Sequence, residues 1–315
     1  MTLNGMFDGN HEARTRASRL FWICATLLVG VLTAIAVTGV SSREAAAQEG
    51  GVAVPLERAH AHNDYEHERP LYDALDHGFK SVEADVWLID GELVVSHDDP
   101  QLPTTEAPKG TLESLYLEPL WQEVKANGGS VYAGDPDYFT LLVDIKSEDA
   151  ATYLALHREL RKYQRMMTRF NPGGVKDGAV TAIVSGNRPR ELMESQHVRY
   201  AAYDGRLSDL GTSTDQTFVP LISDNWTNNF TWQGIGPMPE AERQKLHDIV
   251  ATAHANGQRV RFWETPETPG AREAVWRELI AAEVDYINTD HLAELEAFLL
   301  ANDPQPTVPY VYWND

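Results

Sequence analysis

The sequence predicts an α/β fold: a single (β/α)₈ barrel of the TIM type, with a β-hairpin excursion after the second strand. Eight short runs rich in β-branched and aromatic residues recur along the chain, and amphipathic stretches lie between them. Polar side chains gather at the ends of these runs. Strands that alternate with helices pair in parallel, and eight such units in about 240 residues are the number that closes a barrel.

The N-terminal segment, residues 1–47, has the features of an export signal or a membrane anchor. Three arginines precede an apolar run at residues 20–40, and the small residues Ala45 and Ala47 follow it. This order is typical of a signal peptide, while a run of this length also suffices for an uncleaved membrane tether. Both interpretations place the remaining chain outside the cytoplasm, either secreted or anchored to the outer face of the cytoplasmic membrane.

Residues 48–302 are expected to form the barrel, and residues 303–315 a C-terminal tail, because no repeat or linker divides the chain. The expected strands cover residues 54–60, 79–88, 139–146, 179–186, 198–204, 218–224, 259–264 and 284–290. The clearest helical patterns cover residues 69–78, 150–164, 189–196, 240–257 and 272–283. Residues 91–99 follow the second strand after only a turn at Asp90 and Gly91, a link too short for a parallel crossover, so they form the hairpin.

Composition narrows the class of partner. The chain carries 26 basic and 47 acidic residues, a formal charge of -21, which argues against nucleic acid or an anionic membrane surface. The single cysteine excludes an intrachain disulfide. With nucleic acid and anionic membranes disfavoured, we expect the partner to be a small molecule. The sequence does not indicate an oligomeric state.

The candidate site residues stand at the C-terminal ends of the expected strands, where barrel enzymes carry their sites. Glu83 and Asp85 are two residues apart on a strand, so both point to the same side. Asp144 occupies the same kind of position on the next barrel strand. Three neighbouring carboxylates repel one another unless a cation binds, and hard oxygen ligands favour one divalent ion, Mg²⁺ or Ca²⁺.

Two histidines complete the candidate site. His60 ends the first strand, and His97 ends the hairpin excursion. Both stand beside the acidic cluster in the predicted barrel, where they could face one another across the cation. An imidazole titrates near neutral pH, so it is suited to moving a proton at a reacting oxygen.

Several motifs resemble those of one known family. They are H-A-H-N-D-Y at residues 60–65, P-L-x-x-A-L-x-x-G at 70–78, V-E-A-D-V-W at 82–87 and L-V-V-S-H-D at 93–98. Their order and spacing resemble the phospholipase-C-like phosphodiesterase superfamily, in its glycerophosphodiester phosphodiesterase-like branch. Within that branch the nearest subgroup is named after altered inheritance of mitochondria. V-D-I-K, R-F-W-E and I-N-T-D extend the likeness over most of the chain.

The resemblance implies a metal-dependent phosphoric diester hydrolase that acts on glycerophosphodiesters or phospholipid headgroups. It implies His60 and His97 as the acid/base pair, and Glu83 and Asp85 as metal ligands. Asp144 stands where the branch usually has glutamate, so its contact with the metal is either direct or through water. One histidine would take a proton from a substrate hydroxyl and the other would protonate the leaving alkoxide, which gives a cyclic phosphate that water opens.

The substrate contacts follow from one departure. The branch usually has Arg-Gly after its first histidine, where this chain has Ala61 and His62. A phosphate contact is then expected from another residue, and the candidates are His62, Asn63 and Lys146. Trp263 is the candidate aromatic ring that would stack on the substrate.

Two other functions fit parts of the pattern. His60, His62 and Asp290 would suit a metal-dependent amidohydrolase, which would need further histidines on the middle strands. An exported, non-catalytic ligand-binding barrel would use tryptophans as stacking platforms. The intact histidines beside Glu83 and Asp85 argue against such a binder, because binding alone needs no proton transfer.

Overall fold

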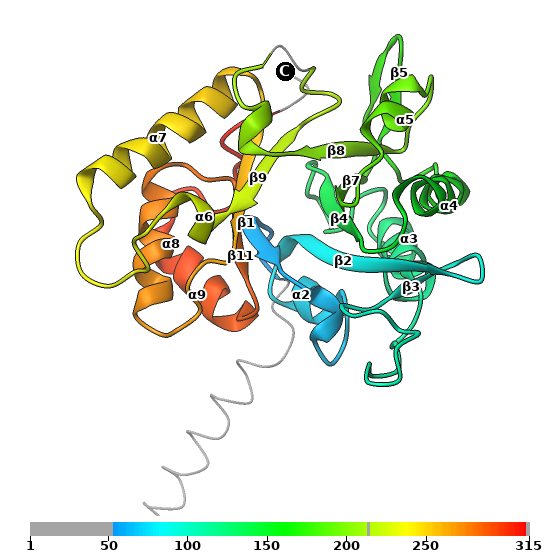
Figure 1. The fold of residues 1–315 in the computed structure, drawn as a ribbon, viewed down its shortest axis with the longest axis horizontal. Coiled ribbons are helices and arrows are strands. Elements are labelled where there is room, and N and C mark those ends of the chain that lie inside the picture. Colours follow the sequence, from blue (N-terminus) through cyan, green and yellow to red (C-terminus); the bar gives the residue numbers. More distant parts are fainter. Residues whose placement is uncertain (1–52, 213–214, 313–315) are drawn as a thin grey trace, which may run out of the picture. The chain divides into compact units, whose positions relative to one another are not determined.

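The computed structural model describes residues 53–212 and 215–312, and within them eight parallel strands form a closed ring (Figure 1). Each strand pairs with the next, and the last pairs with the first, with Ala59 opposite Ile287. The ring consists of β1(Leu56–Ala61), β2(Phe79–Ile89), β4(Phe139–Ile145), β7(Val180–Gly186), β8(Ala201–Gly205), β9(Leu221–Asn225), β10(Arg259–Trp263) and β11(Tyr286–Thr289). The predicted barrel is confirmed. The segment 1–47, with its apolar run, lies outside the described residues.

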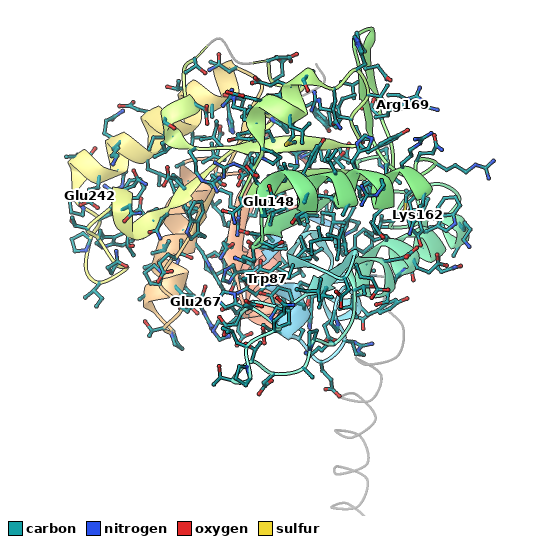
Figure 2. All side chains as sticks on the ribbon, turned by 45° about the vertical axis from the view of Figure 1, so that its right-hand side comes forward. Trp87, Glu148, Lys162, Arg169, Glu242 and Glu267 are labelled. Carbon is teal, nitrogen blue, oxygen red and sulfur yellow. The ribbon has the colours of Figure 1, made fainter. Side chains whose placement is uncertain are left out.

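Helices lie outside the ring, with α3 and α4 on one side and α7, α8 and α9 on the other (Figure 1). The helices are α2(Tyr72–Asp76), α3(Glu118–Ala126), α4(Asp149–Lys162), α5(Arg190–Ser195), α6(Trp226–Asn229), α7(Glu240–Ala255), α8(Ala271–Ala281) and α9(Leu292–Asn302). Short helical turns are η1(Asp64–Glu66), η2(Glu113–Leu117) and η3(Leu207–Asp209). Figure 2 shows α4 between the labelled Glu148 and Lys162. In the described ranges, no helix combines the length and apolarity needed to cross a membrane.

Side chains along β2 point alternately toward the helices and into the barrel, and this alternation positions the candidate site residues Glu83 and Asp85. Val82, Ala84 and Val86 are fully buried in the core that the strands share with the helices. The residues between them point into the barrel, where Glu83 contacts Arg261 on β10, three strands away around the ring. A separate buried apolar cluster consists of Leu142, Phe170, Ile183, Ala202, Leu221 and Tyr286, and the Tyr286 hydroxyl bonds to the buried Thr140 and Arg259.

Two hairpins extend the barrel. β3(Glu92–Val95) pairs antiparallel with the end of β2, with Val95 opposite Val86, which confirms the excursion after the second strand. β5(Arg169–Asn171) and β6(Gly174–Lys176) form a second hairpin before β7 that the sequence did not indicate. These three-residue strands are too short to show an alternation of their own.

The segment after α9 docks on the ends of the strands opposite the site. Arg58 is buried on β1 and donates from its guanidinium to the carbonyls of Gln305 and Val308. Its Nε lies 2.7 Å from a carboxylate oxygen of Asp303, and the guanidinium stacks 3.6 Å from the ring centre of Tyr310. The described part of the tail therefore closes the N-terminal end of the barrel.

Candidate active site

Three carboxylates meet at the C-terminal ends of neighbouring strands. β2 contributes Glu83 and Asp85, and β4 contributes Asp144, which pairs in register with Asp85. One carboxylate oxygen from each lies within 4.8 Å of the others. The structure thus brings together the three acidic residues that the strand pattern predicted as neighbours.

Packing the carboxylates this closely changes their acidity. Burial raises the pKa of Asp144 to about 7, and the charges of Glu83 and Asp85 add to this rise. Burial and the charge of Glu83 also raise the pKa of Asp85. Burial alone would raise the pKa of Glu83 as well, but the guanidinium of Arg261 outweighs it and holds that pKa below its usual range. The cluster therefore favours a cation as a partner.

Two basic side chains already border the cluster. Lys146 Nζ lies 3.1 Å from Asp85 Oδ2 and 3.4 Å from Asp144 Oδ1. Burial lowers the pKa of Lys146, but these two carboxylates outweigh it and raise the pKa above its usual value. Arg261 donates to Glu83 and to Asn288, 2.6 Å away. Two cations against three carboxylates leave the site with one excess negative charge when all are ionised.

The donor set fits a divalent ion. Asp85 Oδ1 is buried and has no hydrogen-bond partner among the described residues, and the buried Asp144 Oδ1 has only the 3.4 Å ion pair with Lys146. Carboxylate oxygens are the ligands that Mg²⁺ and Ca²⁺ prefer. Glu83, Asp85 and Asp144 are the residues that would hold the ion.

His60 lies on one side of the cluster and is almost completely buried. Its Nδ1 shares a 2.7 Å hydrogen bond with Ser81 Oγ, and its Nε2 lies 3.4 Å from Glu83 Oε2. Burial and the nearby charge of Arg261 lower the pKa of His60 to about 4. The imidazole is therefore neutral at pH 7 and able to accept a proton.

His97 contacts a different carboxylate of the same cluster. Its Nδ1 lies 3.1 Å from Asp85 Oδ2, while 57% of its side chain is exposed. The hydroxyl of Tyr65 donates to the same Asp85 oxygen at 2.8 Å and lies 3.4 Å from His97 Nδ1. The two histidines thus contact one cluster at different carboxylates, one imidazole shielded from solvent and the other open to it.

The remaining predicted substrate residues also lie at this end of the barrel. His62 Nδ1 is 2.8 Å from Asp290 Oδ1, and this hydrogen bond raises the pKa of His62, although burial opposes the rise. Asn63 lines a cavity together with His97. Trp263 ends β10, and the guanidinium of Arg206 lies 4.9 Å from its ring centre.

The cavity beside His97 has a volume of about 500 Å³. Its walls come from η1, the end of β3 and the loop that follows, and they are mostly polar. They include Asn63, Tyr65, Glu66, Ser96, Asp98, Thr104, Thr105, Glu106 and Lys109. A polar alcohol could occupy this space next to the exposed imidazole.

A second acidic group lies at the opposite end of the barrel. Glu57, Asp135 and Asp137 also bring carboxylate oxygens together. The buried Lys80 ammonium lies 2.5 Å from Glu57 Oε1 and 2.7 Å from Asp135 Oδ2. Arg259 Nη1 also lies 3.7 Å from Glu57 Oε2, so two basic side chains already contact this group, which we interpret as a structural ion network.

Four residues of the site were not predicted from the sequence: Tyr65, Ser81, Arg206 and Arg261. A signal existed for Ser81 and Arg261, because each stands two residues before a predicted site residue on the same strand and so shares its side of the sheet. Tyr65 closes the H-A-H-N-D-Y motif. Arg206 lies just beyond β8, where a single arginine gives no pattern.

Comparison with known proteins agrees with this geometry. Residues 52–204 match the AIM6-like phosphodiesterase domain, and residues 259–293 match the glycerophosphoryl diester phosphodiesterase family. These two segments contain every catalytic, metal-binding and substrate-binding residue proposed from the sequence.

Similar proteins come from fungi. Altered inheritance of mitochondria protein 6 of Eremothecium gossypii is 29% identical over 282 residues, which cover 77% of this chain and 69% of that protein. The homolog from Arthroderma benhamiae is 28% identical over 76% of this chain and 82% of its own length. The Saccharomyces cerevisiae protein named altered inheritance of mitochondria protein 6 is 28% identical over 276 residues, which cover 74% of this chain and 68% of that protein. These matches are consistent with the glycerophosphodiester phosphodiesterase-like superfamily, and residues 52–204 resemble its AIM6-like phosphodiesterase domain.

Proposed function

We propose that this protein hydrolyses a phosphodiester, either a small glycerophosphodiester or a phospholipid headgroup, with His60 and His97 as the acid/base pair. One observation carries the proposal: two imidazoles contact different members of a single buried cluster of three carboxylates. A protein that only binds ligands has no need for this pairing of proton carriers with a cation site.

The first half of the proposed reaction forms a cyclic phosphate. His60 is neutral at pH 7 and takes the proton from a substrate hydroxyl that neighbours the phosphate. The hydroxyl oxygen then bonds to phosphorus, and the bond from phosphorus to the leaving alcohol breaks. Protonated His97 gives its proton to the leaving oxygen, and its exposure lets the alcohol depart into solvent.

The second half returns both histidines to their starting state. His97, now neutral, takes a proton from water as the water oxygen bonds to phosphorus. The ring oxygen of the cyclic phosphate leaves and receives the proton that His60 holds. The products are the free alcohol and a phosphomonoester.

A divalent cation at Glu83, Asp85 and Asp144 would supply positive charge next to the phosphate oxygens. The chain needs this because its formal charge of -21 repels an anionic substrate. Lys146 adds a second positive group at the same place.

The amidohydrolase alternative finds less support. It would require further imidazole ligands on the middle strands. The described strands β7, β8 and β9 present Ser185, Asp204 and Ser223 instead.

The test is a set of hydrolysis assays with glycerophosphocholine, glycerophosphoinositol and phosphatidylinositol. We expect activity on at least one, its loss in EDTA, and its return with added Mg²⁺ or Ca²⁺. His60→Ala and His97→Ala should each lower kcat by at least about 10²-fold, the usual contribution of a general acid or base.

His77→Ala is the matched control, because His77 also pairs with a carboxylate, that of Glu296, but lies outside the site. It should leave kcat unchanged. Full activity in chelator, or in both site variants, would contradict the mechanism.

We also propose that the barrel acts outside the cytoplasm, on the basis of residues 1–47 alone. Cell fractionation and N-terminal sequencing of the isolated protein test this. A chain beginning at Gln48 indicates a cleaved signal, and an intact N-terminus in the membrane fraction indicates an anchor. A full-length chain in the cytoplasm contradicts both.

A further inference from the structure

Arg206 stands at the mouth of the barrel in an unusually well-fixed position. It follows β8 directly, and 23% of its side chain is exposed. Its Nη1 donates to Asp204 Oδ2 at 2.6 Å and to Ser223 Oγ at 3.1 Å, and its Nη2 donates to Ser185 Oγ at 3.3 Å. Side chains from three adjacent strands therefore hold one guanidinium.

The carboxylate behind this arginine is itself fixed. Asp204 is completely buried and accepts hydrogen bonds from the hydroxyls of Ser185, at 2.7 Å, and Ser223, at 2.6 Å. A buried carboxylate is stable only with partners of this kind. Arg206 is thus positioned before any ligand arrives, and binding would cost little side-chain entropy.

Trp263 covers one face of the guanidinium, with its ring centre 4.9 Å away. Stacking on an aromatic ring leaves the edges of a guanidinium free to donate. Among the described residues, no hydrogen bond uses Arg206 Nε, so this edge has donor capacity to spare. An indole and a guanidinium packed in this way form a surface suited to an anionic oxygen.

The position of Arg206 relates it to the carboxylate cluster. Ser185, which accepts from Arg206, pairs in register with Asp144. Lys146 and Arg261 are bound by members of the cluster, whereas the partner of Arg206 is Asp204, outside it. Arg206 therefore keeps its position whether or not a cation occupies the cluster.

We propose that Arg206, held by Asp204 and stacked on Trp263, binds the phosphate group of the substrate. This rests on the proposed function and deepens it, because it identifies which basic residue receives the phosphate at the mouth of the barrel. A guanidinium can donate two parallel hydrogen bonds to phosphate oxygens, which a lysine cannot do.

The experiment compares Arg206→Gln and Arg206→Lys with the full-length wild type in the presence of Mg²⁺. Calorimetry measures the Kd for inorganic phosphate, and kinetics measure KM and kcat for the phosphodiester that the wild type hydrolyses. Arg206→Gln should raise Kd and KM by about 10- to 100-fold, the range expected for a charged hydrogen-bonding partner, with a smaller change in kcat. Arg206→Lys should recover part of this loss.

Arg243→Gln is the matched control, because Arg243 also pairs with a carboxylate, that of Glu278, on the outer helices. It should leave all three constants unchanged. Thermal unfolding identifies any variant that fails to fold. If Arg206→Gln does not fold, the proposal still requires that Arg206→Lys, which keeps the ion pair with Asp204, bind inorganic phosphate with a higher Kd than the wild type.

The outcomes separate the two proposals. Absence of phosphate binding in the wild type, or an unchanged Kd in folded Arg206 variants, overturns the role of Arg206. Phosphate binding that depends on Arg206, in a protein with no phosphodiesterase activity, overturns the proposed function and supports the anion site.

Discussion

Tyr65 connects the carboxylate cluster to the exposed histidine. Its hydroxyl donates to Asp85 and lies beside His97, so it fixes the oxygen that both His97 and Lys146 approach. We expect Tyr65→Phe to lower kcat about tenfold with little change in KM, because His97 loses its orientation. The cost in folding stability should be about 1 kcal/mol, the usual value for one hydrogen bond.

Tyr132→Phe provides the comparison. The buried Tyr132 hydroxyl donates to the carbonyl of Phe79, away from the site. This variant should lose similar stability and no activity. Equal kcat in Tyr65→Phe and wild type would show that the hydroxyl has only a structural role.

Asp64 makes the stability of the protein depend on pH. Its buried Oδ2 accepts from the Leu71 amide at 2.6 Å and from the Tyr116 hydroxyl at 2.9 Å, and burial raises the pKa of Asp64 to about 7. An unfolded aspartate titrates near 3.9. Between these values the native state holds a proton that the unfolded state has lost, so stability is greatest below about pH 4 and falls as pH rises toward 7.

Urea unfolding at pH 5 and pH 7.5 measures this effect against Asp64→Asn, which cannot ionise. The free energy of unfolding of the wild type should fall more steeply than that of the variant, by up to about 1.4 kcal/mol per pH unit. Other buried acids contribute equally to both proteins, so parallel slopes would exclude a contribution from Asp64.

Site residues differ in how far the sequence predicts them. Glu83, Asp85 and Asp144 follow from period-two alternation on strands, because a strand fixes which side chains share a face. The pairing of Arg261 with Glu83 does not follow, because it joins β2 to β10 across the barrel. Such contacts depend on closure of the ring, and local sequence carries no record of them.

At the scale of elements, the turn after β7 controls the position of Asp144. Gly186 has φ +65°, and a Cβ there would lie 2.1 Å from Asp144 Oδ1 and 2.4 Å from the Ile145 carbonyl oxygen. Gly186→Ala should therefore displace the carboxylate and weaken Mg²⁺ binding at least tenfold in calorimetry. Hydrolysis should fall with it.

Gly91→Ala is the control that distinguishes the steric contact with Asp144 from the backbone strain of an alanine at positive φ. Gly91 has φ +90° in the β2–β3 turn, but a Cβ there meets no atom within 4 Å. It should cost about 1 kcal/mol of stability and leave Mg²⁺ binding intact. Equal Mg²⁺ affinity in both variants would mean that Asp144 takes no part in holding the ion.

Elements were predictable where a repeated pattern was long enough to show. All eight barrel strands were expected, since each is a run of apolar residues between turn signals. The β5–β6 hairpin was not, and its place in the fold depends on tertiary contacts such as the pairing of Phe170 with Arg199. Tertiary pairing of this kind has no local signature.

At the scale of the whole molecule, the buried ion pair between Arg58 and Asp303 is one of the contacts by which the C-terminal segment stabilises the barrel. Arg58→Met leaves Asp303 buried without its cation, which should cost about 3–5 kcal/mol of folding stability. Urea unfolding measures this. The double variant with Asp303→Asn should recover part of the loss, and a single variant as stable as the wild type would show that the tail contributes little.

Because the first strand of the barrel pairs with the last, the barrel can close only late in synthesis. β1 meets β11 only after Tyr286–Thr289 has been synthesised, so a nascent or truncated chain carries β1 with an open hydrogen-bonding edge. Open edges recruit other strands, and such distant pairings form slowly. Chains that stop before residue 286 should therefore accumulate as aggregates rather than as smaller soluble barrels.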